Sequence, residues 1–392
     1  MRRIAAPGRL FARRRAGTRC LAGAGRLARR LRLSGRPADR GSVTIVIAVL
    51  LGGGVLLGTG ALAVDVGQLY AEREQLQSGA DAAALAVAQN CVRTPASCGN
   101  QGTVASGFAN GNAKDGVSAV TVICGRGTGL AACPAPAGTR ADCLGTAPTS
   151  GNYAEVRTAT QQADGSTLLP PSFAQTLLGN GGYQGHRAGS CARVAWGPPA
   201  TASGFAVTLS TCDWNQMTGG ATAYWPAGTV PPASAEGILY LHGSHNANTC
   251  PAGPSGWDAP GGFGWLDDPT STCTTTVSSS GTYGGNTGNS TSHPCQTAIT
   301  QAYTTHRAVL LPVYDGVQGN GSHTTYHLSG FSSFVLTGYR LSGFTASSWL
   351  TGRNLCTGSD RCLYGYFTTA ILPNVGAFGT TSYGTNIVKV VG

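Results

Sequence analysis

Charged side chains are scarce in this 392-residue chain, where Asp, Glu, Lys and Arg together make up 11% of the residues. Lysine occurs only twice, as Lys114 and Lys389. Glycine occurs 59 times, and Ser, Thr and Asn are abundant. This balance indicates an extracellular, loop-rich β protein, and the length allows two or three domains.

Motifs of catalytic and metal sites are also missing. The sequence has no H-E-x-x-H, no G-x-S-x-G and no C-x-x-C, which are patterns of zinc proteases, serine hydrolases and zinc sites. His242 and His245 form an H-x-x-H that could bind a metal or act as a base, but histidines in loops more often face solvent. The pair Asp267 and Asp268 fits a turn better than a calcium site, since oxygen ligands are few nearby. We therefore expect a non-enzymatic protein with no cofactor and no metal.

One stretch, residues 43–64 (VTIVIAVLLGGGVLLGTGALAV), carries no charge. As a helix it is roughly 33 Å long, enough for a hydrocarbon core of about 30 Å. Residues 1–40 hold 13 arginines and one acid, Asp39, whereas the rest of the chain has a net charge of −2. The positive-inside rule then predicts a basic, disordered cytoplasmic arm at 1–40, a transmembrane helix at 41–64 and an extracellular remainder. No aromatic residue interleaves the arginines, so nucleic acid is not an expected partner.

Two alternatives concern this stretch. Ala61-Leu62-Ala63 fits the cleavage rule of a secretory signal peptide, although an apolar core of 22 residues is longer than the usual 7 to 15. Gly54 and Gly58 form a G-x-x-x-G, which lets a second helix approach closely, although glycine is common in membrane helices.

An extracellular helical stalk is expected at residues 65–90. Apolar residues recur there at steps of three and four, interrupted only by Arg73, and no proline occurs between the start of the apolar stretch and Pro95. Such a pattern predicts a helix with one apolar stripe.

The residues around this stalk carry a resemblance to a known family. Residues 63–77 read AVDVGQLYAEREQLQ and residues 80–86 read ADAAALA, following D-R-G-S and the apolar stretch. This arrangement resembles the N-terminal module of the TadE/TadG-like proteins of Flp-type (tight-adherence) pilus assembly, over about 50 residues.

The resemblance implies a pilin-like, single-pass protein of the bacterial plasma membrane that assists pilus assembly or enters the pilus as a minor pilin. Its partners would be Flp-type pilins and the Tad secretion machinery, with self-association left open. The stalk residues that match the motif, and are therefore candidates for assembly contacts, are Asp65, Tyr70, Arg73, Leu76, Gln77 and Asp81.

This chain departs from its relatives in two ways. Prepilin-type processing requires a Glu five residues after the glycine at the cleavage site, but the fifth residue after Gly41 is Val46. Some longer relatives carry a metal-dependent adhesion site with a D-x-S-x-S run, which this sequence lacks. We therefore expect no adhesion site of that kind.

Cysteine is the second organising feature of the chain. Cys20 lies in the basic arm, and the other 12 follow the apolar stretch, six on either side of a Gly/Pro-rich linker at 197–204. They are Cys91, Cys98, Cys124, Cys133, Cys143, Cys191, Cys212, Cys250, Cys273, Cys295, Cys356 and Cys362. An even number beyond a membrane span favours disulfides in an oxidising compartment over zinc, with the connectivity left open.

The fold class that we predict is α+β. A long transmembrane and stalk helix would pack on a pilin-like sheet in region 91–196, with strands near 117–123, 153–158 and 191–196 and a short helix at 171–179. A disulfide-rich, mainly-β domain would follow at 205–392, with no helix and an exposed loop at 274–293.

A second reading of the function rests on that β-rich domain. Its aromatic residues could line a glycan- or cell-wall-binding face, with the N-terminal module serving only as an anchor. Candidates are Trp214, Trp225, Trp257, Phe263 and Trp265, although aromatic residues in a small β domain usually form the core.

Overall fold

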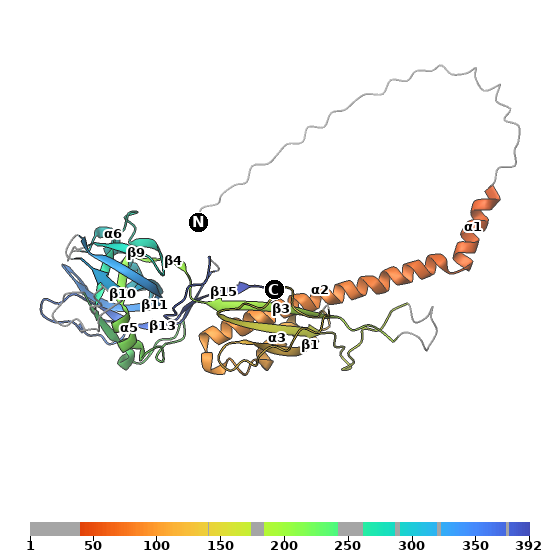
Figure 1. The fold of residues 1–392 in the computed structure, drawn as a ribbon, viewed down its shortest axis with the longest axis horizontal. Helices are drawn as coiled ribbons and strands as arrows, with labels where there is room; N and C mark the ends of the chain where they lie inside the picture. Colours follow the sequence, from red (N-terminus) through yellow and green to blue (C-terminus); the bar gives the residue numbers. More distant parts are fainter. Residues whose placement is uncertain are drawn as a thin grey trace, which may run out of the picture. The chain divides into compact units, whose positions relative to one another are not determined.

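The structure is a computed structural model that describes residues 40–139, 141–173, 184–241, 262–286, 291–319, 323–373 and 376–392. The chain divides into two compact units, Met1–Thr59 and Gly60–Gly392. The first contains helix α1 (Arg40–Gly52) and the beginning of α2 (Val55–Arg93). The second contains the remainder of α2 and all the strands, as the ribbon in Figure 1 shows.

The prediction of a long transmembrane helix is wrong. Across the described ranges, no helix is both long enough and apolar enough to cross a membrane. The apolar stretch is divided at Gly52, Gly53 and Gly54: α1 ends at Gly52, and Gly54 has a φ of +69°. Glycine adopts this left-handed conformation without steric cost, and α2 starts at the next residue. With 13 residues, α1 is about 20 Å long, short of a hydrocarbon core of about 30 Å.

The first sheet has the strand order β1-β2-β3-β15-β14. Its members are β1 (Ala119–Arg126), β2 (Asn152–Ala159), β3 (Gly189–Gly197), β15 (Thr385–Val390) and β14 (Ala370–Leu372). Neighbours are antiparallel except β14 and β15, which run parallel. The sequence assigned these last two strands to the β-rich domain at 205–392, but they extend the sheet of the N-terminal region.

The C-terminal half of α2 packs on this sheet through small side chains. Ala80, Ala83, Ala84, Val87 and Ala88 are buried against Ala154, Val156, Ala192, Val194 and Trp196. A second helix, α3 (Gly102–Asn112), completes this core with Ala105 and Ala109. It approaches so closely that a Cβ on Gly79 would lie 3.1 Å from the Ala109 carbonyl oxygen. Alanine and glycine thus allow the helices and the sheet to make close contact.

The larger β region contains a closed circuit of strands. β10 pairs with β5, then β7, β9 and β11 follow, and β11 pairs back with β10, while β13 and β6 extend the sheet beyond β11. The strands are β5 (Val207–Ser210), β6 (Gly237–Tyr240), β7 (Phe263–Leu266), β9 (Thr282–Asn286), β10 (Ala308–Gln318), β11 (Thr325–Leu341) and β13 (Cys362–Thr368). β12 (Phe344–Ala346) pairs only with β11, and β4 (Thr201–Phe205) pairs with β8 (Thr274–Ser278) in a separate ribbon.

Two helices in this region were not expected from the sequence. α5 (Thr211–Thr218) begins after Ser210, whose hydroxyl accepts a hydrogen bond from the Asp213 backbone N–H. α6 (His293–Thr305) begins after Ser292 in the same way. Short 3₁₀ turns also lie at η1 (Pro95–Ser97) and η2 (Ala233–Ala235).

The loop expected at 274–293 instead contains β8 and β9, because Thr-rich strands can pair without a clear apolar alternation. The linker expected at 197–204 includes the first residues of β4, and the helix expected at 171–179 lies mostly outside the described residues.

The disulfides that the sequence predicted are present. Cys91 pairs with Cys98, Cys124 with Cys133, and Cys143 with Cys191 in the N-terminal region. Cys273 pairs with Cys295, and Cys356 with Cys362, in the β region. Cys212 is also disulfide-bonded, whereas Cys250 and Cys20 lie outside the described residues. These five pairs each join cysteines on one side of the 197–204 segment, and they confirm a disulfide-rich protein.

Candidate functional site

The apolar stripe of α2 continues beyond the sheet that covers its C-terminal half. Leu76, at 2% exposure, and the residues after it on the stripe are buried. On the same face but nearer the N-terminus, Leu62 is 61%, Val66 41% and Tyr70 66% exposed. Residues spaced by three or four lie on one helix face, so one stripe is covered at one end and open at the other. In Figure 1, α2 extends past the ends of β1 to β3 in this direction.

A cavity of about 480 Å³ lies where the stripe leaves the sheet. Its helix side consists of Val66, Leu69, Tyr70 and Arg73. Its other side consists of Thr139, Ala141 and the segment 186–189, which leads into β3. We call this cavity the stalk cleft. Its walls combine apolar side chains with three basic ones, Arg73, His186 and Arg187, and its described lining residues include no acid.

A partly buried acid lies behind the stalk cleft. Burial raises the pKa of Glu72, a hydrogen bond from Thr160 opposes the shift, and the nearby Asp115 carboxylate adds to it. The Thr160 hydroxyl in turn accepts a hydrogen bond from the backbone N–H of Ala188, a residue of the cleft wall, at 3.0 Å. Glu72 therefore belongs to the framework that holds the 186–189 segment against α2.

Asp65, the first acid after the apolar stretch, accepts hydrogen bonds from the backbone of a distant segment. One of its carboxylate oxygens accepts hydrogen bonds from the backbone N–H groups of Ser172 at 2.8 Å and Phe173 at 3.1 Å. Gln68, one turn further on, donates to the Ser172 hydroxyl at 2.6 Å. Together, Asp65 and Gln68 attach the 172–173 segment to the helix.

Three other motif residues, Leu76, Gln77 and Asp81, make contacts within the fold. Leu76 is buried, and its carbonyl oxygen accepts a hydrogen bond from the Thr158 hydroxyl at 2.9 Å. The Gln77 side-chain amide donates to the Cys191 carbonyl oxygen and to the Asp81 carboxylate, both at 3.0 Å. These contacts join α2 to β2 and β3, so among the predicted stalk residues Tyr70 and Arg73 are the ones that line the stalk cleft.

The two glycines predicted to pair helices do not share one helix. Gly54 lies between α1 and α2 with positive φ, and Gly58 lies within α2. The Gly58 backbone N–H donates to the Gly54 carbonyl oxygen at 2.6 Å, so Gly54 starts the hydrogen-bonding of α2.

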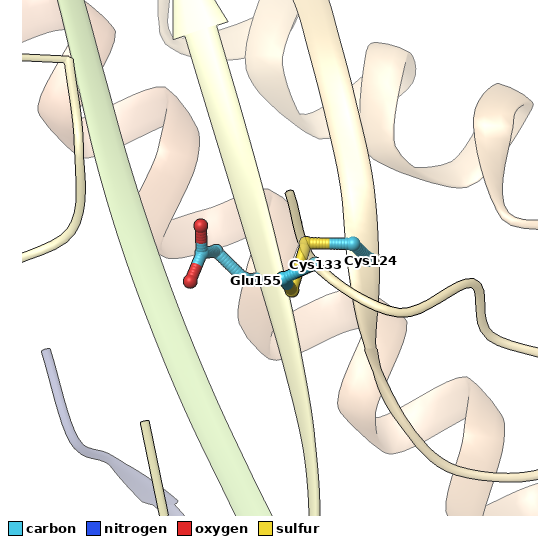
Figure 2. Close-up of side chains that lie close together, drawn as sticks. All are labelled: Cys124, Cys133 and Glu155. Carbon is cyan, nitrogen blue, oxygen red and sulfur yellow. A yellow bond between two sulfur atoms is a disulfide. The ribbon is translucent and has the colours of Figure 1, made fainter. Parts of the chain in front are cut away.

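Glu155 lies close to two disulfides on the face of the sheet opposite α2. Cys124 and Cys133 lie on one side of it (Figure 2), and Cys143 and Cys191 form the second group. Each group of two sulfurs and a carboxylate has the proximity of a metal site, but all four sulfurs are in disulfides and offer no thiolate. Glu155 instead pairs with Arg157 at 2.8 Å and Arg193 at 2.7 Å.

The other sequence candidates do not gather into a site. His242 and His245 lie outside the described residues, as does Trp257. His327 contacts Asp315 at 2.5 Å, and His306 stacks on Trp349 with ring centroids 4.0 Å apart. Trp214, Phe263 and Trp265 are buried in the core of the β region, whereas Trp225 is half-exposed.

Sequence reasoning missed the wall of the stalk cleft that faces the helix. No local pattern marks Thr139, Ala141, His186 or Arg187, because they become neighbours of α2 only when the sheet forms. The available signal was the length of the apolar stripe, which is greater than the small sheet can cover.

The comparisons with known proteins fit this assignment of the N-terminal region. No curated protein and no solved structure matches the chain. Residues 41–90 match the family model described as Putative Flp pilus-assembly TadE/G-like. The matched range includes α1 after its first residue and nearly all of α2, and thus both the covered and the open parts of the stripe. Residues 41–90 are therefore similar to the TadE/G-like family of Flp pilus assembly, the family that the motifs of this segment predicted.

Proposed function

We propose that this protein is a non-enzymatic, pilin-like component of Flp-type pilus assembly that binds a helix of a pilin-like partner through the open stripe of α2. We define the open stripe as Leu62, Val66, Leu69, Tyr70 and Arg73. The observation that carries the proposal is the continuation of one apolar face from a covered half of α2 to an uncovered half.

The open stripe has the character of a helix-binding surface. Apolar side chains repeat along it at steps of three and four, the spacing with which a partner helix interdigitates. Full burial of one such side chain contributes roughly 1.5–3 kcal/mol. Association itself costs at least about 4 kcal/mol, so a single pairing would be weak and repeated contacts in an assembly would be needed.

The residues before α2 support the same kind of partner. In α1, Val43, Ile45, Val46, Ile47, Val49 and Leu51 are all exposed. An apolar surface of this size is unusual in a monomer and marks an interaction site. We infer that neighbouring pilin-like helices cover it in the assembled state.

The disulfides support a location outside the cytoplasm. Three of them lie within the N-terminal region that packs on α2, and such bonds persist in oxidising compartments. The protein would therefore present both the sheet region and the β region on the outer side of the cell.

The test is a charge placed on the open stripe. The double variant Val66→Asp and Tyr70→Asp should keep its fold, because both side chains are exposed to solvent and not part of the core. It should reduce piliation and coprecipitation of the pilin. The control is Ala71→Asp, which adds one of these two negative charges on the same turn, at an exposed position outside the cleft lining. Electron microscopy and pilin in the sheared fraction would report piliation. Normal piliation in a double variant produced at the wild-type level would refute the proposal.

A further inference from the structure

A second cleft lies in the β region, separate from the open stripe. It has a volume of about 670 Å³, within the range of small-molecule sites. Its walls come from α5, from the segment leading into β6, and from β13. Among the lining residues are Gln216, Trp225, Ser234, Glu236 and Tyr240, and we call it the β-region cleft.

Trp225 is held in this cleft by its backbone. Its N–H donates to the Phe367 carbonyl oxygen at 3.2 Å, and its carbonyl oxygen accepts from the Thr368 hydroxyl at 2.6 Å and the Thr369 N–H at 3.3 Å. The side chain remains half-exposed, unlike those of Trp214 and Trp265. A large, partly exposed aromatic ring at the wall of an open cleft, on a backbone held by three hydrogen bonds, is positioned to stack with a ligand.

Polar groups next to this ring are available to a ligand. Within the described residues, the Trp225 indole N–H and the Tyr240 hydroxyl make no hydrogen bond to protein. Gln216 and Ser234 are exposed, and the Gln216 side-chain amide has a sulfur contact of 3.8 Å with Cys212. The cleft lining thus combines hydrogen-bonding side chains, Gln216, Ser234 and Tyr240, with the aromatic surface of Trp225.

The cleft offers no unpaired charge among its described lining residues. Glu236 is their only ionisable carboxylate, and hydroxyl groups occupy it: Thr337 and Ser348 donate to one oxygen, and Thr351 donates to the other at 2.9 Å. The described part of its lining includes no Lys, Arg or His. A charged ligand would lose hydration here without gaining an opposite charge.

We propose that the β-region cleft binds a neutral carbohydrate, whose C–H face stacks on Trp225 and whose hydroxyls bond with Tyr240, Gln216 and Ser234. A sugar has both the apolar face and the dense, uncharged hydroxyl groups that these walls complement. This goes beyond the proposed role in assembly, because it assigns a ligand class to a site outside α2.

The test uses the full chain and three neutral probes: chitotriose, cellotriose and mannotriose. Saturation-transfer NMR and tryptophan fluorescence should detect binding of at least one, with a Kd on the order of 1 mM or below. Trp225→Ala should weaken it at least about tenfold, and Trp225→Phe should retain part of it. Ser234→Arg, which places a long side chain over the cleft, should block it without altering the core.

The matched control is Val230→Ala, an exposed apolar residue in the same segment that does not line the cleft. It should bind like the wild type, and equal thermal unfolding midpoints should confirm that every variant is folded. Absence of binding to all three sugars, or equal binding by Trp225→Ala, would overturn the proposal. So would binding of a proline-rich peptide that depends on Trp225 while the sugars do not bind.

Discussion

Replacing Glu155 by Gln should destabilise the N-terminal region strongly, although the change removes no volume. Glu155 is 1% exposed and accepts hydrogen bonds from both arginines beside it. Arg157 Nε donates at 2.8 Å, and Arg193 donates through Nε at 3.1 Å and Nη2 at 2.7 Å. The amide keeps the shape of the side chain but not its charge.

The substitution leaves the two arginines with different remaining partners. Arg157 retains Asp142 at 2.8 Å, so it remains paired. Arg193, whose side chain is 7% exposed, keeps a 3.5 Å contact of Nη1 with the Gly145 carbonyl oxygen and a position 5.9 Å from the Tyr153 ring centroid, but no carboxylate partner within the described residues. Breaking a buried pair by removing one partner costs about 3–5 kcal/mol, and because Arg157 keeps its second partner we expect the lower end, about 3 kcal/mol.

Denaturant unfolding with the disulfides intact would measure this loss. Glu74→Gln, which removes the same charge from an exposed position on α2, should change the free energy of unfolding by less than about 0.5 kcal/mol. Adding Arg193→Leu to Glu155→Gln removes the unpaired charge and should restore part of the lost stability. The reasoning fails if Glu155→Gln behaves like Glu74→Gln, or if the double variant is less stable than the single one.

Three further predictions concern α2 and its connection to α1. Leu76→Ala should cost about 2–5 kcal/mol in urea unfolding, whereas Tyr70→Ala should stay within about 0.5 kcal/mol; similar losses would mean that the stripe has no open half. Burial raises the pKa of Glu72 above 4.5, so its stabilising contribution is complete below that pH and is lost as the pH rises through the raised value. Glu72→Gln should therefore gain stability relative to wild type from about pH 4 to about pH 7, and a constant difference would contradict the shift. Gly54→Ala disfavours the φ of +69° and should therefore convert α1 and α2 into one continuous helix. Distances between spin labels on either side of Gly54 would detect this change. Unchanged distances would mean that the glycine does not cause the break between the helices.

Much of the N-terminal fold could be predicted because its signals are local. The alternating residues of β2 and β3 and the helical period of α2 are visible within short windows. The break at Gly54 could not be deduced, because a glycine in an apolar run is compatible with both a continuous helix and a left-handed turn. Hydropathy alone favoured the continuous helix.

The β region was harder to predict because its elements depend on distant partners. β8 and β9 consist largely of Thr, Ser and Gly. They form strands because β8 pairs with β4, and β9 pairs with β7 and β11. α5 and α6 are short, and serine caps mark their starts better than apolar periodicity does. The stalk cleft and the β-region cleft combine segments far apart in the chain, so their linings could not be inferred from any one motif.

The pairing of β15 with β3 also has a consequence for the order of folding. Val390 lies opposite Val194, so a ribosome that has released β3 must synthesise nearly 200 further residues before that edge is filled. Until then β3 exposes an unpaired edge, which is prone to pair with other chains. Formation of the complete first sheet must therefore await synthesis of the β region, and a chain truncated before β15 would expose the unpaired edge to chaperones and proteases.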